Sequence, residues 1–406
     1  MSQHHRETPR VAVLATLDTK GDEARFLADR LRSRGVTPLL IDLALTGTSP
    51  DDADITRADL ARHGATGASG DDRTAAMEST ATAAADVLRS LVDEGEIQGV
   101  VGIGGGTGGW MSQRAVEPLP FGFPKVVVTT VVKPSGEHDI VFIPSVVDVA
   151  GLNVLLRTVL EHAASALAGM VAGDARSSPV EEGRPAVAMT MFGVTTAGGD
   201  VARATLEAAG FDVVVFHATG AGGRTMERLI ADGRFAGVLD WTTTELVQHV
   251  AGGLCDAGAE RLRAAAEHGV PQVVVPGAVD VINVLPPVPD EYAERVTHWH
   301  LPTVPLVRAS AAESAAVGRW IGERLSTATA PAAVLIPRGG FSSLDVAGGD
   351  FEDEAADAAF ETAVRTAIGD GTVITSPLHI NDAEFARQAA ETLLQMLDVP
   401  RQDRKE

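Results

Sequence analysis

The sequence is poor in cysteine, in positive charge and in long hydrophobic runs. Cys255 is the only cysteine among 406 residues, which excludes an intrachain disulfide, a cysteine-rich zinc site and a dithiol redox pair. Lys and Arg total 33 against 55 Asp and Glu, and the resulting net charge of −22 disfavours nucleic acid and anionic membranes as partners. The N-terminal residues lack the apolar core of a signal peptide, and the most apolar stretch, 270–288, is interrupted by Pro, Asp and Asn. We therefore expect a cytoplasmic protein.

Length and composition predict two domains. With 45% apolar residues, a chain of this length can bury at least two hydrophobic cores. The polar stretch SSPVEEGRP is the natural boundary between them. We predict a first domain over residues 1–176, a linker at 177–185 and a second domain over 186–406.

Strands and helices alternate along the first half. Residues 11–17 predict a strand, and the apolar spacing of i, i+3, i+4 and i+7 from Ala24 to Leu31 predicts a helix after it. Residues 46–75 are polar and glycine-rich, which is typical of an excursion from a sheet. Near-continuous apolar strands are typical of parallel sheets covered on both faces. The pattern predicts a Rossmann-like, doubly wound α/β domain with a helix around 76–93 and further strands at 36–42, 97–103 and 125–131.

The second half repeats this pattern. The apolar stretch 186–192 corresponds to the first strand, and four further segments of the second half match segments of the first half in the same order. The closest match pairs PSVVDVAGLN with PGAVDVIN, and so pairs Asp148 with Asp280 and Asn153 with Asn283. We predict two copies of one α/β unit that carry these residues after the same strand and face each other across a cleft. The alternative is that all doubly wound domains look alike at this level of detail.

Five glycines follow the predicted strand 97–103. They match G-x-G-x-x-G formally, but that fingerprint belongs after the first strand of a dinucleotide-binding unit, and the Lys-Ser/Thr pair of a Walker loop is missing. Consecutive backbone N–H groups at a helix start nevertheless form an anion site, so we predict phosphate binding, with a positive φ at Gly106. A tight strand-to-helix turn is the alternative. The predicted phosphate-binding residues are Gly104, Gly105, Gly106, Thr107, Gly108 and Gly109.

The loop LDTKGD, residues 17–22, follows the first strand and is therefore expected at the same sheet edge. Lys20 could neutralise a phosphate there, and Asp18 could hold a metal ion or a hydroxyl group. An ordinary helix start explains these residue types equally well. Asp42, at the end of the second strand, is better explained as a turn residue than as a ribose ligand. Thr19, Asp148 and Asn153 complete the predicted pocket.

Longer motifs resemble those of one family. Eight stretches, in order, are similar to the Tm-one-like ATP-binding domain family, which includes the N-terminal virus-inhibitory part of the tomato mosaic virus resistance protein and its bacterial relatives: ATLDTKGDE, GIGGGTGG, SVVDVAGLN, HATGAGGRTME, LDWTTTELVQHVAGGL, PGAVDVIN, PRGGFSSLD and LHINDAEFA. The resemblance runs over essentially the whole chain. It implies two Rossmann-like subdomains, ATP bound by the first, nucleotide contacts at Thr16, Asp18, Lys20 and Gly104–Gly109, and a homodimer. The chain departs from the family pattern at VVKPSG and at HWHLPTVPLVRAS.

The second half carries polar residues that predict a separate anionic ligand. Glycine-rich stretches with an arginine or serine after a strand are a common way to hold a carboxylate or phosphate. The predicted substrate-binding residues are Gly222, Gly223, Arg224, Asp280, Asn283, Gly339, Gly340 and Ser342, and the catalytic candidates are His217, Glu245, Arg338 and His379. Loop-stabilising roles are the alternative for these polar groups. The sequence HWH at 298–300 lacks a third ligand, so no protein metal site is assigned.

These features predict an ATP-binding protein that takes the nucleotide with Mg²⁺ in its first domain. A small anionic substrate in the cleft would make it an enzyme. A nucleotide-gated binding or regulatory protein without turnover is the alternative, and the sequence leaves both open.

Overall fold

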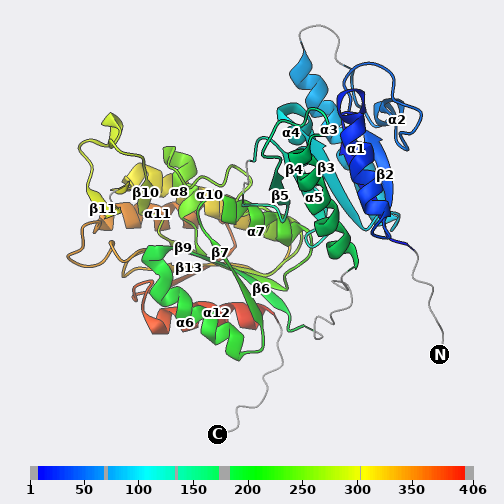
Figure 1. The fold of residues 1–406 in the computed structure, drawn as a ribbon. Coiled ribbons are helices and arrows are strands. Elements are labelled where there is room, and N and C mark those ends of the chain that lie inside the picture. The colour runs from blue at the N-terminus through cyan, green and yellow to red at the C-terminus, as the bar shows by residue number, and fades with distance from the viewer. Residues whose placement is uncertain (1–7, 68–71, 133–135, 173–182, 302, 398–406) are drawn as a thin grey trace, which may run out of the picture. The chain divides into compact units, whose positions relative to one another are not determined.

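The computed structural model describes residues 8–67, 72–132, 136–172, 183–301 and 303–397 (Figure 1). The chain divides into two compact units, Met1–Glu181 and Glu182–Glu406, and each has its own parallel sheet. Most of the predicted linker 177–185, and residues 133–135 of the VVKPSG stretch, lie outside the described residues. The prediction of two Rossmann-like α/β units is confirmed.

Unit 1 is built on a five-stranded parallel sheet in the order β2-β1-β3-β4-β5. Its strands are apolar and buried along most of their length, except for the edge strand β5, so helices must cover both faces. The strands are β1 (Arg10–Ala15), β2 (Thr37–Asp42), β3 (Gly99–Gly104), β4 (Lys125–Thr129) and β5 (Val141–Pro144).

Two helix layers cover the sheet of unit 1. Leu27 and Leu160, from α1 (Leu17–Arg32) and α5 (Val154–Ala172), belong to the core on one face. Leu88 and Met111, from α3 (Arg73–Asp93) and α4 (Gly106–Val116), belong to the core on the other face. The predicted excursion contains one short helix, α2 (Arg57–Arg62). By length and composition α5 alone, among the described helices, is apolar enough to cross a membrane, but its buried residues pack in this core.

Unit 2 is built on a six-stranded parallel sheet in the order β14-β13-β9-β8-β6-β7. Neighbouring residues of β9 face opposite layers. Val273 and Val275 pack with α6 (Thr196–Ala208) and α12 (Ala383–Met396), while Val274 packs with α8 (Thr244–Ala251), α10 (Ala311–Ser326) and α11 (Glu354–Ala367). The strands are β6 (Ala186–Met191), β7 (Asp212–His217), β8 (Gly237–Thr242), β9 (Gln272–Gly277), β13 (Ala332–Pro337) and β14 (Thr372–Ser376).

Most helices of unit 2 follow strands of its parallel sheet, as in unit 1, whereas α10 follows the small antiparallel sheet described below. The 3-10 helix η1 (Gly193–Thr195) leads directly into the first of them. The α-helices are α6 (Thr196–Ala208), α7 (Ala221–Ala231), α8 (Thr244–Ala251), α9 (Ala264–Glu267), α10 (Ala311–Ser326), α11 (Glu354–Ala367) and α12 (Ala383–Met396).

A small antiparallel sheet lies between β9 and β13 in the chain and was not predicted. Its order is β10-β12-β11, with strands β10 (Val281–Asn283), β11 (Thr297–Leu301) and β12 (Val304–Arg308), and the 3-10 helix η2 (Asp290–Tyr292) precedes β11. The stretch HWHLPTVPLVRAS, which departs from the family pattern, supplies β11 and β12.

The strand orders β2-β1-β3-β4 and β7-β6-β8-β9 are equivalent, which supports a duplication. The prediction that Asp148 and Asp280 follow equivalent strands is wrong. Asp148 follows β5, the fifth strand of its sheet, whereas Asp280 follows β9, the fourth strand of its sheet. The two motifs share only the conformation of a local turn. Val146 and Ala278, each two residues before the aspartate, are both left-handed, with φ of 65° and 56°.

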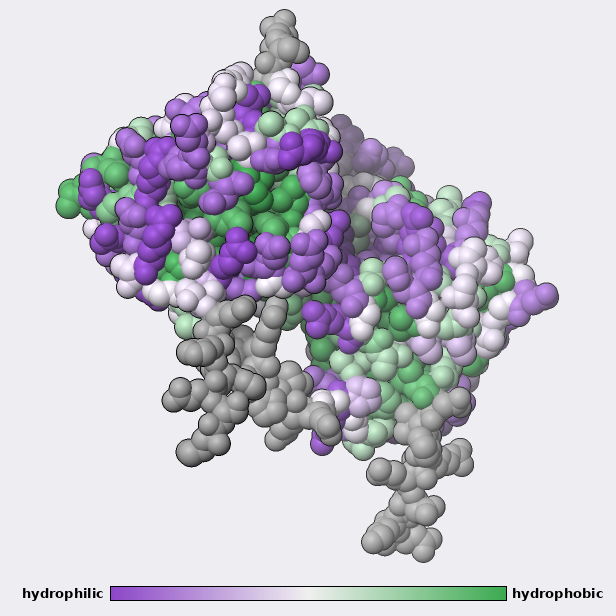
Figure 2. Space-filling model, turned by 90° about the vertical axis from the view of Figure 1, so that its right-hand side faces the viewer, coloured by the Kyte–Doolittle hydropathy of each residue, from purple (hydrophilic) through white to green (hydrophobic). Residues whose placement is uncertain are grey.

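Most of the molecular face in Figure 2 is hydrophilic, with smaller hydrophobic areas between the polar side chains. This agrees with the excess of acidic over basic residues in the chain.

Helix α4 approaches β3 and β4 so closely that glycine is required at two positions. A Cβ on Gly109 would lie 2.1 Å from Thr129 Oγ1, and one on Gly104 would lie 2.6 Å from the backbone at Gly108 and Gly109. Side chains at these positions would push the start of α4 away from the sheet.

We therefore expect Gly109→Ala to lower the free energy of unfolding by about 1–3 kcal/mol through overpacking. Gly106→Ala is the matched control, because nothing lies within 4 Å of a Cβ at Gly106, and its effect should stay within about 0.5 kcal/mol. Urea denaturation of the two variants measures the difference. Equal effects at both positions would contradict the packing described for α4.

Candidate functional site

The candidate site of unit 1 lies at the carboxyl ends of its parallel strands. The first turns after β1, β3, β4 and β5 meet at this edge because the strands run the same way. Two observations join these turns. A Cβ on Gly108 would lie 3.8 Å from Thr16 Oγ1, and one on Gly105 would lie 3.6 Å from Asp148 Oδ1 and 3.9 Å from Thr130 Oγ1.

The five glycines of this turn serve two different purposes. Gly104 and Gly109 allow the close packing of α4 described above, which is the alternative that the sequence left open. Gly105, Gly106 and Gly108 have open space or only contacts beyond 3.5 Å around a Cβ. The predicted positive φ at Gly106 is wrong, because this residue is the first of α4 and does not lie in the left-handed region. Packing therefore does not explain the glycines at these three positions.

The first turn of α4 presents backbone N–H groups to this open space. Gly106, Thr107 and Gly108 are the first three helical residues, so their N–H groups have no acceptor within the helix, and the N-cap Gly105 has no side chain to supply one. The Gly109 N–H is the first to be paired, donating to the Gly105 carbonyl at 2.8 Å. Aligned peptide dipoles add a positive potential at this end of the helix.

The loop after β1 forms a separate turn before the long part of α1. Thr19 and Lys20 donate their N–H groups to the Thr16 carbonyl at 3.1 and 2.8 Å, and Lys20 leaves helical geometry with φ −125° and ψ 21°. The Thr19 hydroxyl contacts both the Thr16 hydroxyl at 3.0 Å and Asp18 Oδ1 at 3.2 Å. Among the described residues, no hydrogen bond or ion pair engages the Lys20 ammonium group. The Lys20 side chain, at the point where α1 departs from helical geometry, is therefore available to bind an anion at this sheet edge.

Three carboxylate or amide side chains hold the loops around this edge. Asp42 Oδ1 accepts N–H bonds from Leu17 at 3.0 Å and Ala44 at 2.9 Å, and its Oδ2 accepts from the Ser49 hydroxyl at 2.7 Å, so both oxygens are engaged in fixing a turn. Glu23 accepts from the Gly151 N–H at 2.7 Å. The predicted ligand Asn153 is the N-cap of α5, since its Oδ1 accepts from the N–H groups of Leu155 and Leu156 at 3.0 and 2.9 Å.

In unit 2 the glycine turn after β7 is occupied by the protein itself. Glu245 Oε1 accepts from the N–H groups of Gly220 and Gly223, at 2.7 and 3.0 Å, at the start of α7. A Cβ on Gly222 would lie 1.9 Å from the His217 carbonyl and one on Gly223 2.2 Å from Glu245. An internal carboxylate therefore holds the position where a substrate anion was predicted.

A buried arginine completes this arrangement. Arg261 donates to Glu245 through Nε at 2.7 Å, to Asp240 through both terminal nitrogens at 2.6 and 2.8 Å, and to Glu227 at 3.1 Å. Burial lowers the pKa of Arg261, but the Asp240 and Glu245 carboxylates outweigh burial and raise it well above its ordinary value. Sequence reasoning missed this network because its members are far apart in the chain and the loop of Arg261 carries no recognisable motif.

The remaining predicted residues of unit 2 fall into separate hydrogen-bonded groups. Ser342 donates to Asp280 at 2.6 Å, while His379 donates from Nε2 to the Ser342 carbonyl at 2.8 Å. Gly339 and Gly340 pack against His379, where a Cβ on Gly339 would lie 2.6 Å from its N atom. Other pairs are Asn283 with Gln248, Arg224 with the Asp256 carbonyl, and Arg338 with Glu361. The four catalytic candidates are thus not brought together by their contacts.

His217 is one of two exposed candidates, together with Arg338. Its Nδ1 contacts the Met191 carbonyl at 3.1 Å and its ring stacks on Phe192. A carbonyl partner makes Nδ1 the protonated nitrogen, which leaves Nε2 as an acceptor at an exposed position.

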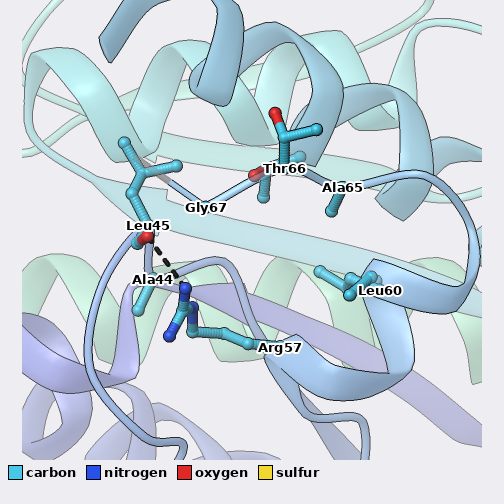
Figure 3. A pocket seen from close by; sticks show the side chains of 9 residues that line it. Ala44, Leu45, Arg57, Leu60, Ala65, Thr66 and Gly67 are labelled. Atoms are coloured by element: carbon cyan, nitrogen blue, oxygen red, sulfur yellow. Dashed lines mark hydrogen bonds between the residues drawn. The ribbon is translucent and has the colours of Figure 1, made fainter. Parts of the chain in front are cut away.

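Two concavities of the described chain lie away from both predicted sites. A pocket of about 40 Å³ lies under the excursion after β2, where Arg57 donates to the Leu45 carbonyl beside Leu60 and Thr66 (Figure 3). A shallow groove of about 480 Å³ runs between Ser376–Leu378 and the exposed side of α12. The first has room for little more than water, and neither is lined by the residues discussed above.

Protein metal ligands do not cluster in the parts of the chain that the structure describes, since no group of three His, Cys, Asp or Glu side chains could hold an ion. Burial raises the pKa of the Cys255 thiol to about 11, so this cysteine is not an activated nucleophile.

Replacing Arg261 should be severely destabilising, because it would leave buried carboxylates without a counter-charge. We expect Arg261→Met to lower the free energy of unfolding of unit 2 by about 3–5 kcal/mol. Arg263→Met is the matched control at an exposed neighbour whose ion pairs are on the surface. Denaturation followed by tryptophan fluorescence measures both. A loss below 1 kcal/mol at Arg261 would contradict the role assigned to the network.

Comparisons with known proteins agree with this two-unit division. The models of the N-terminal and C-terminal domains of an uncharacterised protein family (UPF0261) match residues 9–176 and 184–397. A UPF0261 protein of Clostridium tetani is 39% identical over 402 residues, which cover 96% of this chain and 99% of that protein. A UPF0261 protein of Mesorhizobium japonicum is 41% identical over 404 residues, which cover 95% of this chain and 98% of that protein.

The ToMV resistance protein Tm-1 of Solanum lycopersicum is 34% identical over 428 residues, which cover 98% of this chain but 57% of that protein. Among solved structures, an esterase domain from Rhodothermus marinus covers 53% of this chain and 87% of its own at 14% identity, and its TM-score of 0.28 is too low to bear on function. The chain belongs to the UPF0261 family, the same Tm-one-like family that its sequence motifs resemble.

Proposed function

We propose that unit 1 binds the phosphates of a nucleotide, ATP with Mg²⁺, at the start of α4. The observation that carries the proposal is the first turn of this helix, where the N–H groups of Gly106, Thr107 and Gly108 have no acceptor among the described residues and the turn lies beside Thr16 and Asp148. Such a turn is suited to a phosphate because its donors and its dipole both favour an anion.

Three side chains around the turn suit the rest of a metal-bound phosphate group. The Lys20 ammonium supplies a positive charge, and the Thr16 hydroxyl is a further donor. Asp148 is exposed, and no hydrogen bond engages its carboxylate among the described residues, so it is available to a Mg²⁺ ion carried in on the phosphates. The choice of ATP and of a homodimer follows the family resemblance, and the cytoplasmic location follows the composition of the chain.

The contrast with unit 2 supports placing the nucleotide in unit 1. At the α7 turn the Glu245 carboxylate already accepts the glycine N–H groups, and at α6 the Asn381 side chain accepts from the Gly198 N–H at 3.1 Å. The α4 turn has no such internal acceptor among the described residues. We therefore favour a nucleotide-binding protein in which unit 2 has another role.

Titration calorimetry with ATP and Mg²⁺ tests the proposal. Gly106→Val places a side chain where the phosphate would lie, and this position has no protein atom within 4 Å of the added Cβ. We expect this change to weaken ATP binding by a factor of at least about 10. Gly193→Val is the matched control, since Gly193 also opens a helix after a strand and also has nothing within 4 Å of a Cβ. Failure of the natural protein to bind at millimolar ATP, or equal losses in the two variants, would refute the site.

Lys20 gives an independent test. We expect Lys20→Met to weaken ATP binding about tenfold while leaving stability unchanged, because a charge-assisted hydrogen bond contributes about 1.5–3 kcal/mol. Arg30→Met on the same helix is the control, and the loss should shrink at high salt because Lys20 is only partly buried. An unchanged dissociation constant for Lys20→Met would remove this residue from the site.

A second candidate function is an enzyme that acts on a small anionic metabolite at unit 2. The exposed Nε2 of His217 favours it, since a neutral imidazole acceptor can remove a proton at physiological pH. If a metabolite screen finds turnover, His217→Ala should abolish it and leave ATP affinity unchanged. Turnover that survives this change, or loss of ATP binding, would exclude the assignment.

A further inference from the structure

Beyond the proposed nucleotide site, unit 2 contains a buried group of carboxylates with too little positive charge beside it. Asp280 follows β9, Asp345 follows β13, and Asp357 lies in the first turn of α11. Asp280 is fully buried and Asp345 is 3% exposed. Arg308, at the end of β12, is the arginine whose positive charge favours the ionised form of all three carboxyl groups.

Arg308 does not neutralise Asp280 by direct contact. Its Nε donates to the Phe351 carbonyl at 2.7 Å, its Nη1 to the Ala309 carbonyl at 3.1 Å and its Nη2 to Asp357 at 2.9 Å. The guanidinium group therefore forms an ion pair with Asp357, and its other described hydrogen bonds go to backbone.

The other neighbours do not pair with Asp280. Burial raises the pKa of Asp345 and His379 lowers it, but His379 Nδ1 accepts from the Asn381 N–H at 3.0 Å and its Nε2 donates to the Ser342 carbonyl, so these hydrogen bonds of its ring go to backbone. Asp353 uses its carboxylate to cap α11, accepting from Ala355 and Ala356. Three acidic groups thus face one arginine.

Asp280 is the most poorly satisfied of them. Its Oδ2 accepts from the Ser342 hydroxyl at 2.6 Å, whereas its Oδ1 is buried without a hydrogen-bond partner among the described residues. A carboxylate with one hydrogen bond and no contacting cation is far more costly to bury than a neutral carboxylic acid.

We propose that Asp280 keeps its proton in the folded protein at mildly acidic pH and loses it near neutrality, so that the packing of the 339–345 loop against β9 and β12 depends on a bound proton. The same burial, and the Asp345 carboxylate beside it, raise the pKa of Asp280 to about 7. Deprotonation of Asp280 would place its negative charge beside that of Asp345. Asp345 lies on the same loop as Ser342, whose hydroxyl group donates to Asp280. Loss of the proton therefore weakens the packing of this loop.

The sign of the pH effect follows from linkage. A folded-state pKa above the unfolded value means that the folded state holds the proton over the range between them. Stability from this group is fully present below the unfolded pKa of about 4 and falls as pH rises toward about 7. Above that range the contribution stays constant.

The test compares the natural full-length chain with Asp280→Asn, a neutral side chain that still accepts from Ser342. Urea unfolding followed by tryptophan fluorescence reports mainly on unit 2, which holds Trp241, Trp299 and Trp320. The equilibrium constant of unfolding of the natural protein, divided by that of the variant, should rise about tenfold for each pH unit between about 5 and 7. Asp212→Asn, an exposed change at the start of β7, should give a flat ratio. A flat ratio for Asp280→Asn would overturn the proposal.

Infrared difference spectroscopy tests it without relying on the variant's stability. The natural protein at about pH 5 should show the carbonyl stretch of a buried carboxylic acid, and raising the pH through about 7 should remove it. The same band should be missing from Asp280→Asn and present in Asp212→Asn. Absence of the band from the natural protein, or its persistence in Asp280→Asn, would overturn the assignment to this residue.

Discussion

The close approach of α4 to β3 and β4 is the constraint on which the proposed site depends. Thr129 and the backbone of α4 leave no room for a Cβ at Gly109 or Gly104, so the helix begins at the sheet edge itself. Its first three N–H groups are consequently held beside the turns that carry Thr16 and Asp148. A helix set further from the sheet would lose this alignment, whatever residues lined it.

The two units use similar turns in opposite ways. In unit 2 the Glu245 carboxylate accepts the N–H groups of the glycine turn, and Arg261 holds that carboxylate in place. The N–H groups of this turn therefore have acceptors without a ligand. In unit 1 the N-cap of α4 is Gly105, which has no side chain to accept such hydrogen bonds. The same type of fold thus contains one turn whose N–H groups are paired internally and one whose N–H groups remain unpaired.

Much of the fold could be predicted from the sequence, because apolar strands and helix spacing are local signals. The strands at 11–17 and 186–192 and the helix at 76–93 lie within one to three residues of β1, β6 and α3. The β10-β12-β11 sheet was missed, since its short strands alternate with Pro and polar residues. The shared turn of Val146 and Ala278 suggested equivalent strands, but a local turn does not determine a strand's place in the sheet.

The site could be predicted only in part. The glycine turn, Thr16 and Asp148 come together because parallel strands end at one edge, which sequence order reveals. The roles of Asn153 as a cap and of Glu245 as an internal anion depend on side-chain partners that are distant in sequence or set by local geometry. Arg261 and Arg308 carried no motif, so only the structure shows that they serve buried carboxylates.

Hydrogen–deuterium exchange of the full-length protein with and without ATP and Mg²⁺ tests the central claim most directly. The account predicts slower exchange in peptides that cover Gly105–Gly109 and the Thr16–Lys20 turn, with the α7 turn of unit 2 unchanged. Protection confined to unit 2, or no change at the start of α4 under saturating ATP, would contradict it.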